Sequence, residues 1–180
     1  MAAREASALE SALTLSDFTS PGLIVPHLHG QDAIAVIHEL SQAMQWKKRV
    51  TDLLPFYSEA LNREFLVSSD LEVGMAFPHV RLPGLKRLFF ALGRSEEPLR
   101  WSGNRDHSVS LVFLMAVPAT DATHYLSLIS SIGRMARDGR LVEKLHAAPA
   151  NFEMFEVLQQ VELRTNKLLT SKTGSPQPSP

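Results

Sequence analysis

The sequence predicts an α/β protein in which a mixed β-sheet is flanked by helices on both faces, a three-layer sandwich folded as a single domain. Three observations support this prediction. Strand-like and helix-like segments alternate along the chain. The run VSLVFLMAV near residue 113 is apolar at every position except Ser110, so both faces of the strand that it predicts must be covered. The 180 residues are 44% hydrophobic, which is enough for one sizeable core.

The first half of the chain predicts one strand and two helices. Gly22–Leu28 indicates a short strand, which Pro26 places at a sheet edge or a strand end. Asp32 caps a helix with apolar residues spaced for a single face. A second helix begins at Thr51 or Asp52. Its expected apolar stripe consists of Leu54, Ser58, Leu61 and Phe65.

The second half predicts three strands followed by three helices. Val73–Phe77 forms a strand that runs into Pro78 and His79, and strands over Lys86–Gly93 and Ser108–Val117 follow. Thr120 caps a helix that stops at Asp138 and Gly139. Two shorter helices are expected near Leu141–Ala147 and Asn151–Glu162.

The ends of the chain differ from its middle. We predict a loosely ordered N-terminus over residues 1–12, a compact domain over 13–164, and a disordered tail rich in Pro and Ser over 165–180. Between the two ends there is no linker-like composition and no internal repeat.

Composition narrows the classes of function. The formal net charge is −1, so no basic field favours nucleic acid or a membrane surface. The longest uncharged apolar stretch, Ser108–Ala119, is about half of the roughly 20 residues that a spanning helix needs, and Met1–Ser16 does not read as a signal peptide. We therefore expect a cytoplasmic protein without membrane insertion. The absence of cysteine excludes disulfides, thiolate chemistry and Cys-rich metal sites.

One segment, Arg63–Leu85, combines residue types suited to phosphoryl chemistry. His79 follows Pro78, which fixes the backbone at a strand end, where an imidazole keeps access to water. A neutral imidazole nitrogen can attack phosphorus, while nearby guanidinium and hydroxyl groups hold the phosphoryl oxygens. The candidate binding groups are Arg63, Ser68, Ser69 and Arg81. Taken alone, a histidine beside proline is more often a packed loop residue than a catalytic one.

Other candidate sites have less support. His27 and His29 would lie on one face of an extended strand, but no third ligand motif accompanies them, so we predict no metal. There is no G-x-x-x-x-G-K-[ST] loop, no G-x-G-x-x-G loop and no G-x-S-x-G turn. We accordingly predict no cofactor.

The segment containing His79 resembles the EIIA domains of the mannitol/fructose class in the bacterial phosphotransferase system. Their pattern is close to R-E-x-L-x-S-T-G-I-G-x-G-x-A-I-P-H-x-R-L-P-G. The residues that coincide with it are Arg63, Glu64, Leu66, Ser68, Gly74, Ala76, Pro78, His79, Arg81, Leu82, Pro83 and Gly84. Further along, VFLMAVPATDATHYLSLIS is similar to the strand, loop and H-L-x-x-L helix of those domains, and LSDFTSPGLIV at Leu15–Val25 to their opening strand. The resemblance extends from Leu15 to Glu162.

The resemblance implies a phosphotransferase activity in which His79 is phosphorylated, with Arg63 and His124 beside it. It implies phosphate donation by HPr or a nitrogen-branch HPr-like carrier, and transfer to a cysteine on a separate EIIB domain. Standalone EIIA proteins similar to the nitrogen-branch type imply an alternative, a regulatory protein whose phosphorylation controls its partners. His124 is expected in the first turn of a helix, where an anion is favoured, although a solvent-facing role fits the same position.

The chain departs from the pattern in the loop before His79. Asp70 and Glu72 replace glycines, and Ser69 replaces the usual threonine. Two carboxylates near a phosphoryl group would slow transfer or alter the choice of partner, unless their side chains point into solvent. A degenerate module that binds partners without being phosphorylated is the third alternative.

Overall fold

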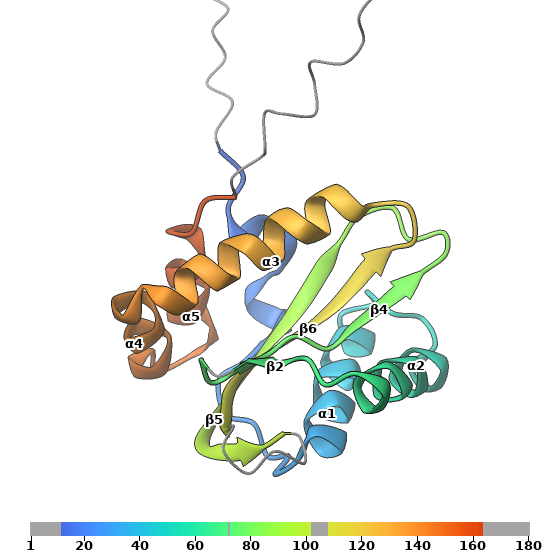
Figure 1. Ribbon diagram of the computed structural model, residues 1–180, viewed down its shortest axis with the longest axis horizontal. Helices are drawn as coiled ribbons and strands as arrows, with labels where there is room; N and C mark the ends of the chain where they lie inside the picture. The colour runs from blue at the N-terminus through green and yellow to red at the C-terminus, as the bar shows by residue number, and fades with distance from the viewer. Residues whose placement is uncertain (1–11, 72, 102–107, 164–180) are drawn as a thin grey trace, which may run out of the picture.

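The predicted mixed sheet is present, with helices on both of its faces (Figure 1). A computed structural model describes residues 12–71, 73–101 and 108–163. Within them the sheet has six strands in the order β1-β5-β6-β3-β2, and β4 also pairs with β6. The strands are β1 (Ile24–Val25), β2 (Asp70–Leu71), β3 (Met75–Ala76), β4 (His79–Leu82), β5 (Phe89–Arg100) and β6 (Ser108–Pro118).

Strand β6 is the centre of the sheet. It pairs antiparallel with β5 on one side and parallel with β3 and β4 on the other. Its residues alternate between two cores: Phe113 and Met115 pack into one, whereas Val112 and Leu114 pack into the other, and all four are fully buried. The apolar run of β6 is therefore explained as the sequence predicts, by burial on both faces of the strand.

Two layers of helices cover the sheet. Helices α1 (Ala33–Trp46) and α2 (Leu53–Leu66) enclose one core. The other core lies under α3 (Ala122–Arg137), α4 (Gly139–Ala147), α5 (Asn151–Gln159) and the 3-10 turn η1 (Leu15–Phe18). These five helices and the sheet confirm the three-layer α/β fold.

The helix ends agree with the sequence signals in most places. The Asp32 carboxylate accepts a hydrogen bond from the Ala35 backbone N–H, so Asp32 caps α1 as predicted. The prediction of Thr120 as the cap of α3 is wrong. The cap is Asp121, whose carboxylate accepts from the His124 N–H and is a better acceptor than a hydroxyl. At the far end of the helix, Asp138 both terminates α3 and caps α4.

Two expectations about early elements need correction. The first strand spans only Ile24–Val25, because Pro21–Leu23 forms a 3-10 turn before it and Pro26 cannot donate to a ladder after it. The apolar stripe expected on α2 is also wrong: Leu54 and Phe65 are both 69% exposed. The side chains of α2 that are buried are Phe56, Ala60 and Glu64.

The first and last described segments of the chain are joined by backbone hydrogen bonds. The Leu15 N–H donates to the Val161 carbonyl at 2.9 Å, and the Leu163 N–H donates to the Leu13 carbonyl at 2.6 Å. The predicted N-terminus 1–12, apart from Ala12, and the predicted tail 165–180 lie outside the described residues. Within the described part of the chain, none of the helices has both the length and the apolar character that a bilayer crossing requires.

Candidate functional site

His79 lies where two short strands follow one another along the same side of β6. Ala76 is in register with Val112 on β6, and His79 is in register with Met115. Between them, the Phe77 N–H turns away from β6 and donates to the Ser69 hydroxyl at 3.0 Å, while Pro78 has no N–H to donate. The predicted strand Val73–Phe77 is therefore Met75–Ala76, and His79 begins a strand of its own.

Three groups contact the His79 ring. The Arg63 Nε–H donates to His79 Nε2 at 2.9 Å. On the other side of the ring, His79 Nδ1 lies 3.4 Å from the Phe77 carbonyl oxygen and 3.5 Å from the Tyr125 hydroxyl. Because Arg63 needs an acceptor at Nε2, the favoured neutral tautomer carries its proton on Nδ1. The lone pair of His79 is then on Nε2.

The surroundings of His79 favour the neutral imidazole. Burial lowers the pKa of His79 below its ordinary value of 6.5, and the positive charges of Arg63 and Arg81 lower it further. The Phe77 carbonyl and the Glu64 carboxylate act in the opposite direction on this pKa. A neutral ring with a free electron pair is the form of histidine that can act as a nucleophile.

Helix α2 supplies Arg63 and fixes the loop that follows it. Arg63 is in the last turn of α2, and its neighbour Glu64 is buried. One oxygen of Glu64, Oε1, accepts from the Ser69 N–H at 2.7 Å, from the Trp101 indole N–H at 2.7 Å and from the Ser68 hydroxyl at 3.1 Å. This buried carboxylate holds the start of the loop that leads to His79.

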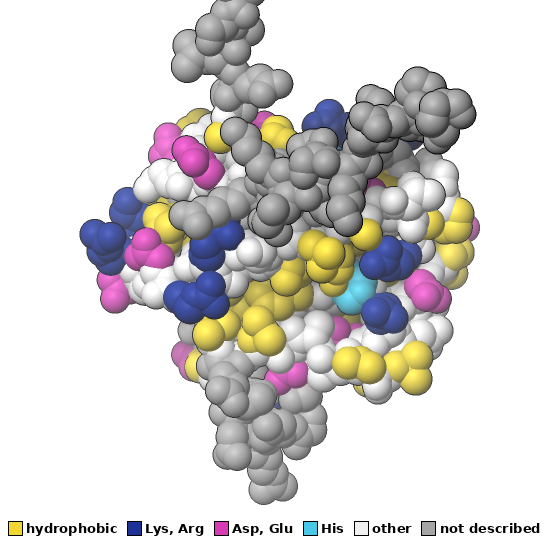
Figure 2. Space-filling view, turned by 45° about the horizontal axis from the view of Figure 1, so that its top comes forward, with side chains coloured by type: hydrophobic (Ala, Val, Ile, Leu, Met, Phe, Trp, Pro, Cys, Tyr) yellow, Lys and Arg dark blue, Asp and Glu magenta, His cyan; other side chains and the backbone are white. Residues whose placement is uncertain are grey.

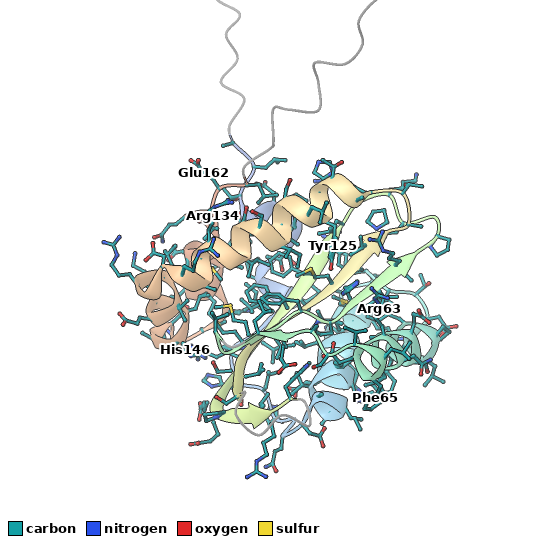
Figure 3. All side chains as sticks on the ribbon, in the orientation of Figure 1. Arg63, Phe65, Tyr125, Arg134, His146 and Glu162 are labelled. Carbon is teal, nitrogen blue, oxygen red and sulfur yellow. The ribbon has the colours of Figure 1, made fainter. Side chains whose placement is uncertain are left out.

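Helix α3 contributes Tyr125 to the site. The Tyr125 ring lies 5.2 Å from the His79 ring, centroid to centroid, and the Arg81 guanidinium lies 5.6 Å from the Tyr125 centroid. His124, one residue earlier, has different neighbours: its Nδ1 is 2.9 Å from the Asp121 carboxylate, and its ring is 6.2 Å from that of Phe18. Figure 3 shows Tyr125 of α3 and Arg63 of α2 at the same end of the sheet as β4.

The structure thus assembles part of the predicted set of site residues. Arg63 and His79 are in direct contact, and Arg81 joins them through Tyr125. The Ser68 hydroxyl bonds to Glu64 of α2 and the Ser69 hydroxyl accepts from the Phe77 N–H, so these two serines hold the loop and do not bond to the imidazole. The sequence analysis did not name Tyr125 or Glu64 as site residues. The only indication for Tyr125 in the sequence is that its polar phenol interrupts the apolar face of α3.

The family follows from a comparison over most of the chain. Residues 17–161 match the family described as phosphoenolpyruvate-dependent sugar phosphotransferase system, EIIA 2. The chain belongs to this EIIA family. Phosphotransfer is the chemistry of the family as its description gives it.

Several relatives of this EIIA domain are nitrogen regulatory or sugar-system proteins. A nitrogen regulatory protein of Bradyrhizobium diazoefficiens is 26% identical over 151 residues, 81% of this chain and 95% of that protein. The 2-O-alpha-mannosyl-D-glycerate-specific EIIABC component of Escherichia coli is 28% identical over 124 residues, 68% of this chain. The matched part is only 19% of that component's length.

Solved structures share the fold of this EIIA domain. The nitrogen regulatory protein IIA-Ntr from Neisseria meningitidis superposes with a TM-score of 0.69 at 23% identity, covering 80% of this chain and 98% of that one. A complex of the mannitol enzyme IIA and phosphorylated enzyme IIB from Escherichia coli matches with a TM-score of 0.63 at 16% identity, covering 77% and 95% of the two chains.

The loop in which this EIIA domain departs from the glycine-rich pattern is ordinary in conformation at Asp70. Among the described residues, Lys48 is the one non-glycine with a positive φ, so the backbone at Asp70 requires no glycine. Gly74, which the pattern and this chain share, has a φ of 77° and does require one. The Ser68 hydroxyl shares its one proton between the carboxylates of Asp70 and Glu64, and Glu72 lies outside the described residues.

The apolar side chains next to His79 in the sequence are mostly part of the interior. Met75, Phe77 and Val80 are buried in the two cores. Exposed large apolar side chains flank the site in the sequence and include Phe65, Leu66 and Val67 at the end of α2, Leu71 and Val73 before His79, and Leu126 in α3. Figure 2 shows hydrophobic and basic side chains gathered around a surface histidine on one face of the molecule.

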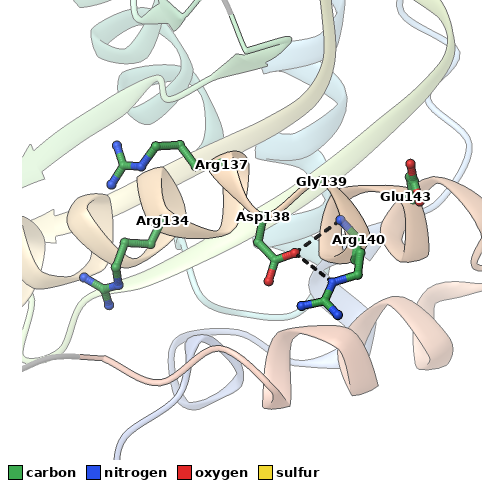
Figure 4. Close-up of a pocket in the computed structure, with 6 residues that line it drawn as sticks. All are labelled: Arg134, Arg137, Asp138, Gly139, Arg140 and Glu143. Atoms are coloured by element: carbon green, nitrogen blue, oxygen red, sulfur yellow. Dashed lines mark hydrogen bonds and ion pairs between the residues drawn. The ribbon is translucent and has the colours of Figure 1, made fainter.

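Two further groups of polar residues serve the fold. His27 and His29 bond to different carboxylates, those of Glu96 at 2.8 Å and Glu39 at 3.0 Å. Among the residues that the structure describes, no three His, Cys, Asp or Glu side chains gather as metal ligands would. An open pocket of about 750 Å³ at the α3–α4 junction is lined by Arg134, Arg137, Asp138, Gly139, Arg140 and Glu143 (Figure 4). The Asp138 carboxylate caps α4 and pairs with Arg140, and the arginine side chains of the pocket point apart.

Proposed function

We propose that this EIIA domain is a phosphoryl carrier that accepts a phosphoryl group on Nε2 of His79. The observation that carries the proposal is the hydrogen bond from Arg63 to Nε2, because it assigns the ring proton to Nδ1 and the lone pair to Nε2. Arg63 gives up this bond when phosphorus approaches, and its guanidinium is then beside the phosphoryl oxygens. The lowered pKa of His79 supports the same assignment by keeping the ring neutral. The family membership supplies the class of reaction.

The transfer is a balanced exchange between two histidines. The lone pair of His79 Nε2 forms a bond to phosphorus while the bond from phosphorus to the donor nitrogen breaks, and the donor leaves with that electron pair. The donor is phosphorylated HPr or a nitrogen-branch HPr-like protein. The transition state has little bonding on either side, so the protein must mainly position the ring and balance charge. Arg63 and Arg81 provide that charge without a metal or another cofactor.

The next acceptor is a cysteine of a separate EIIB domain. These 180 residues contain no cysteine, so the thiolate that would receive the phosphoryl group must come from outside them. Phe65, Leu66 and Val67 provide exposed apolar surface close in sequence to Arg63, which suits transient docking of such partners. A carrier with these partners operates in the cytoplasm, where HPr is itself phosphorylated.

The test is phosphorylation by a reconstituted chain. Wild type incubated with phosphoenolpyruvate, Enzyme I and HPr should gain one acid-labile, base-stable phosphate by intact mass. His79→Gln should gain none. His146→Gln is the matched control, because His146 is another histidine whose pKa burial lowers but it lies against Ser110 instead of Arg63. Label retained by His79→Gln would remove the site assignment.

A second role is a regulatory switch. The similarity to proteins named as nitrogen regulatory proteins favours a regulatory role, because it covers about four fifths of this chain and nearly all of those proteins. A phosphoryl group adds about −1.5 to −2 charges at neutral pH. On a chain with a net charge of −1, this changes the surface strongly. If phosphorylated wild type is stable against every EIIB domain offered but binds a target differently in its two states, regulation is the function. A wild type that takes no label supports the third role, a module that binds without phosphorylation.

A further inference from the structure

Tyr125 lies between His79 and Arg81 and contacts both of them. Its hydroxyl is 3.5 Å from His79 Nδ1, its ring is 5.2 Å from the His79 ring, and the Arg81 guanidinium lies 5.6 Å from the Tyr125 centroid. We propose that Tyr125 is a positioning residue that sets the lifetime of phosphorylated His79 and holds Arg81 beside it. This inference rests on the proposed function and goes further by naming the residue that controls its kinetics.

The hydroxyl of Tyr125 can serve both protonation states of His79. The other neighbour of Nδ1, the Phe77 carbonyl, only accepts hydrogen bonds and so favours a ring that is protonated at Nδ1. A phenol can accept from Nδ1–H or donate to the Nδ1 lone pair. Burial raises the pKa of Tyr125 above its ordinary value of 10.0, so the phenol keeps its proton at neutral pH. Tyr125 therefore provides what the carbonyl cannot, a donor to the unprotonated ring.

The protonation state of Nδ1 controls how long the phosphoryl group stays. In hydrolysis, water attacks phosphorus, the P–Nε2 bond breaks, and its electron pair returns to Nε2. A ring with a proton already on Nδ1 leaves as neutral imidazole, whereas an unprotonated ring must leave as an anion. By stabilising the unprotonated ring, the Tyr125 hydroxyl slows hydrolysis. The charged groups that act on this ring are Arg63 and Glu64 from α2 and Arg81 from β4. Arg63 lies on the Nε2 side of the ring, Arg81 lies against Tyr125, and the Glu64 carboxylate has no proton to donate.

The ring of Tyr125 has a separate task. His79 and Arg81 are two residues apart on β4 and so project to the same face of the sheet, the face that α3 covers. The aromatic face of Tyr125 lies within the range at which it attracts the Arg81 guanidinium. This contact orients Arg81 before a phosphoryl group arrives, which lowers the cost of ordering it on transfer.

Two variants separate these tasks. Tyr125→Phe removes the hydroxyl and keeps the ring, whereas Tyr125→Leu, the residue of the H-L-x-x-L pattern, removes both. His79 is phosphorylated with phosphoramidate, a small chemical donor that needs no protein partner, and loss of label is followed from about pH 6 to pH 9. Loss of one neutral hydrogen bond corresponds to roughly two- to tenfold faster hydrolysis near pH 7.5 for Tyr125→Phe. Uptake of phosphate from HPr by Tyr125→Leu should fall about two- to fivefold, because this variant also loses the ring that holds Arg81.

The unphosphorylated protein gives an independent readout. In ¹⁵N NMR spectra, Tyr125→Phe should shift the Nδ1 resonance of His79 and leave both ring resonances of His146 unchanged. If hydrolysis follows the same pH profile in wild type and Tyr125→Phe and the Nδ1 resonance does not move, the inference is wrong. If wild type takes label from phosphoramidate but none from HPr, the carrier function fails while the role of Tyr125 is still decided by hydrolysis. If no reagent labels His79, the inference is wrong, because there is no phosphorylated state whose lifetime Tyr125 could set.

Discussion

The buried carboxylate of Glu64 is expected to stabilise both the fold and the loop that leads to the site. It is 7% exposed, and its Oε1 atom accepts three hydrogen bonds, two of them at 2.7 Å. Glu64→Ala removes the acceptor and leaves the indole N–H of Trp101, itself 6% exposed, and the Ser69 N–H without a partner. We expect this substitution to destabilise the domain substantially.

The size of the effect follows from those contacts. Each buried donor left without an acceptor costs about 1–3 kcal/mol, so the two N–H groups together cost about 2–6 kcal/mol. The carboxylate no longer has to be desolvated in the variant, which offsets part of that cost. We therefore expect a loss of about 2–5 kcal/mol in the free energy of unfolding, a large share of the roughly 5–15 kcal/mol of a typical domain. Glu64→Gln keeps an oxygen acceptor but not the charge, and it should cost about 1–2 kcal/mol.

Urea unfolding followed by Trp fluorescence and by circular dichroism measures these differences. A loss of this size moves the midpoint by about 1–2 M at the slope of an average domain. Glu59→Ala is the matched control, because Glu59 is an exposed carboxylate on the same helix and should change the free energy by less than about 0.5 kcal/mol. The reasoning is refuted if Glu64→Ala unfolds within about 1 kcal/mol of wild type, or if Glu64→Gln is as damaging as Glu64→Ala.

Three further predictions test other parts of the structure. Arg94 is 5% exposed and donates to four backbone carbonyls, three of them around the end of α4, so Arg94→Met should lower the free energy of unfolding by about 2–4 kcal/mol in urea. Arg63→Gln removes a positive charge beside His79, so the pKa of His79 should rise, and an unchanged or lower NMR titration midpoint would contradict this. Burial lowers the pKa of His79, so the unfolded chain binds more protons than the native state just below pH 6.5. The free energy of unfolding should therefore decrease as the pH falls below 6.5. His79→Gln should flatten this part of the plot of unfolding free energy against pH.

The sequence predicted those features that depend on local pattern. The apolar run of β6 is confirmed because residues 111–117 are buried on both faces of the strand. The cap at Asp32 and the break at Asp138 are confirmed because a short acidic side chain at a helix end bonds to the backbone beside it. Apolar runs and helix caps can be predicted because they depend only on residues that are close together in the sequence.

Helix α2 shows why the rest could not be predicted. Its composition suggested a stripe through Leu54 and Phe65, yet the helix turns the face of Phe56 and Ala60 inward and leaves those two exposed. That face also buries Glu64, which an apolar stripe would not include. The reason is non-local: the partners of Glu64 include an indole that is 37 residues away in the chain. No periodicity within the helix reports such a partner.

The site itself depends on β4 being at the edge of the sheet. From Ala76 to His79 and from Val112 to Met115 the register advances equally on both strands, so β3 and β4 follow β6 as one line that is broken only at Phe77 and Pro78. Among the described strands, β4 pairs with β6 alone, and no other strand separates it from the helix layers. Arg63 from the α2 layer and Tyr125 from the opposite layer can therefore both reach one imidazole. A histidine on a central strand would meet only one layer. The two nitrogens of His79 can be controlled separately, one by a guanidinium and one by a phenol, because the strand that carries them has a free edge.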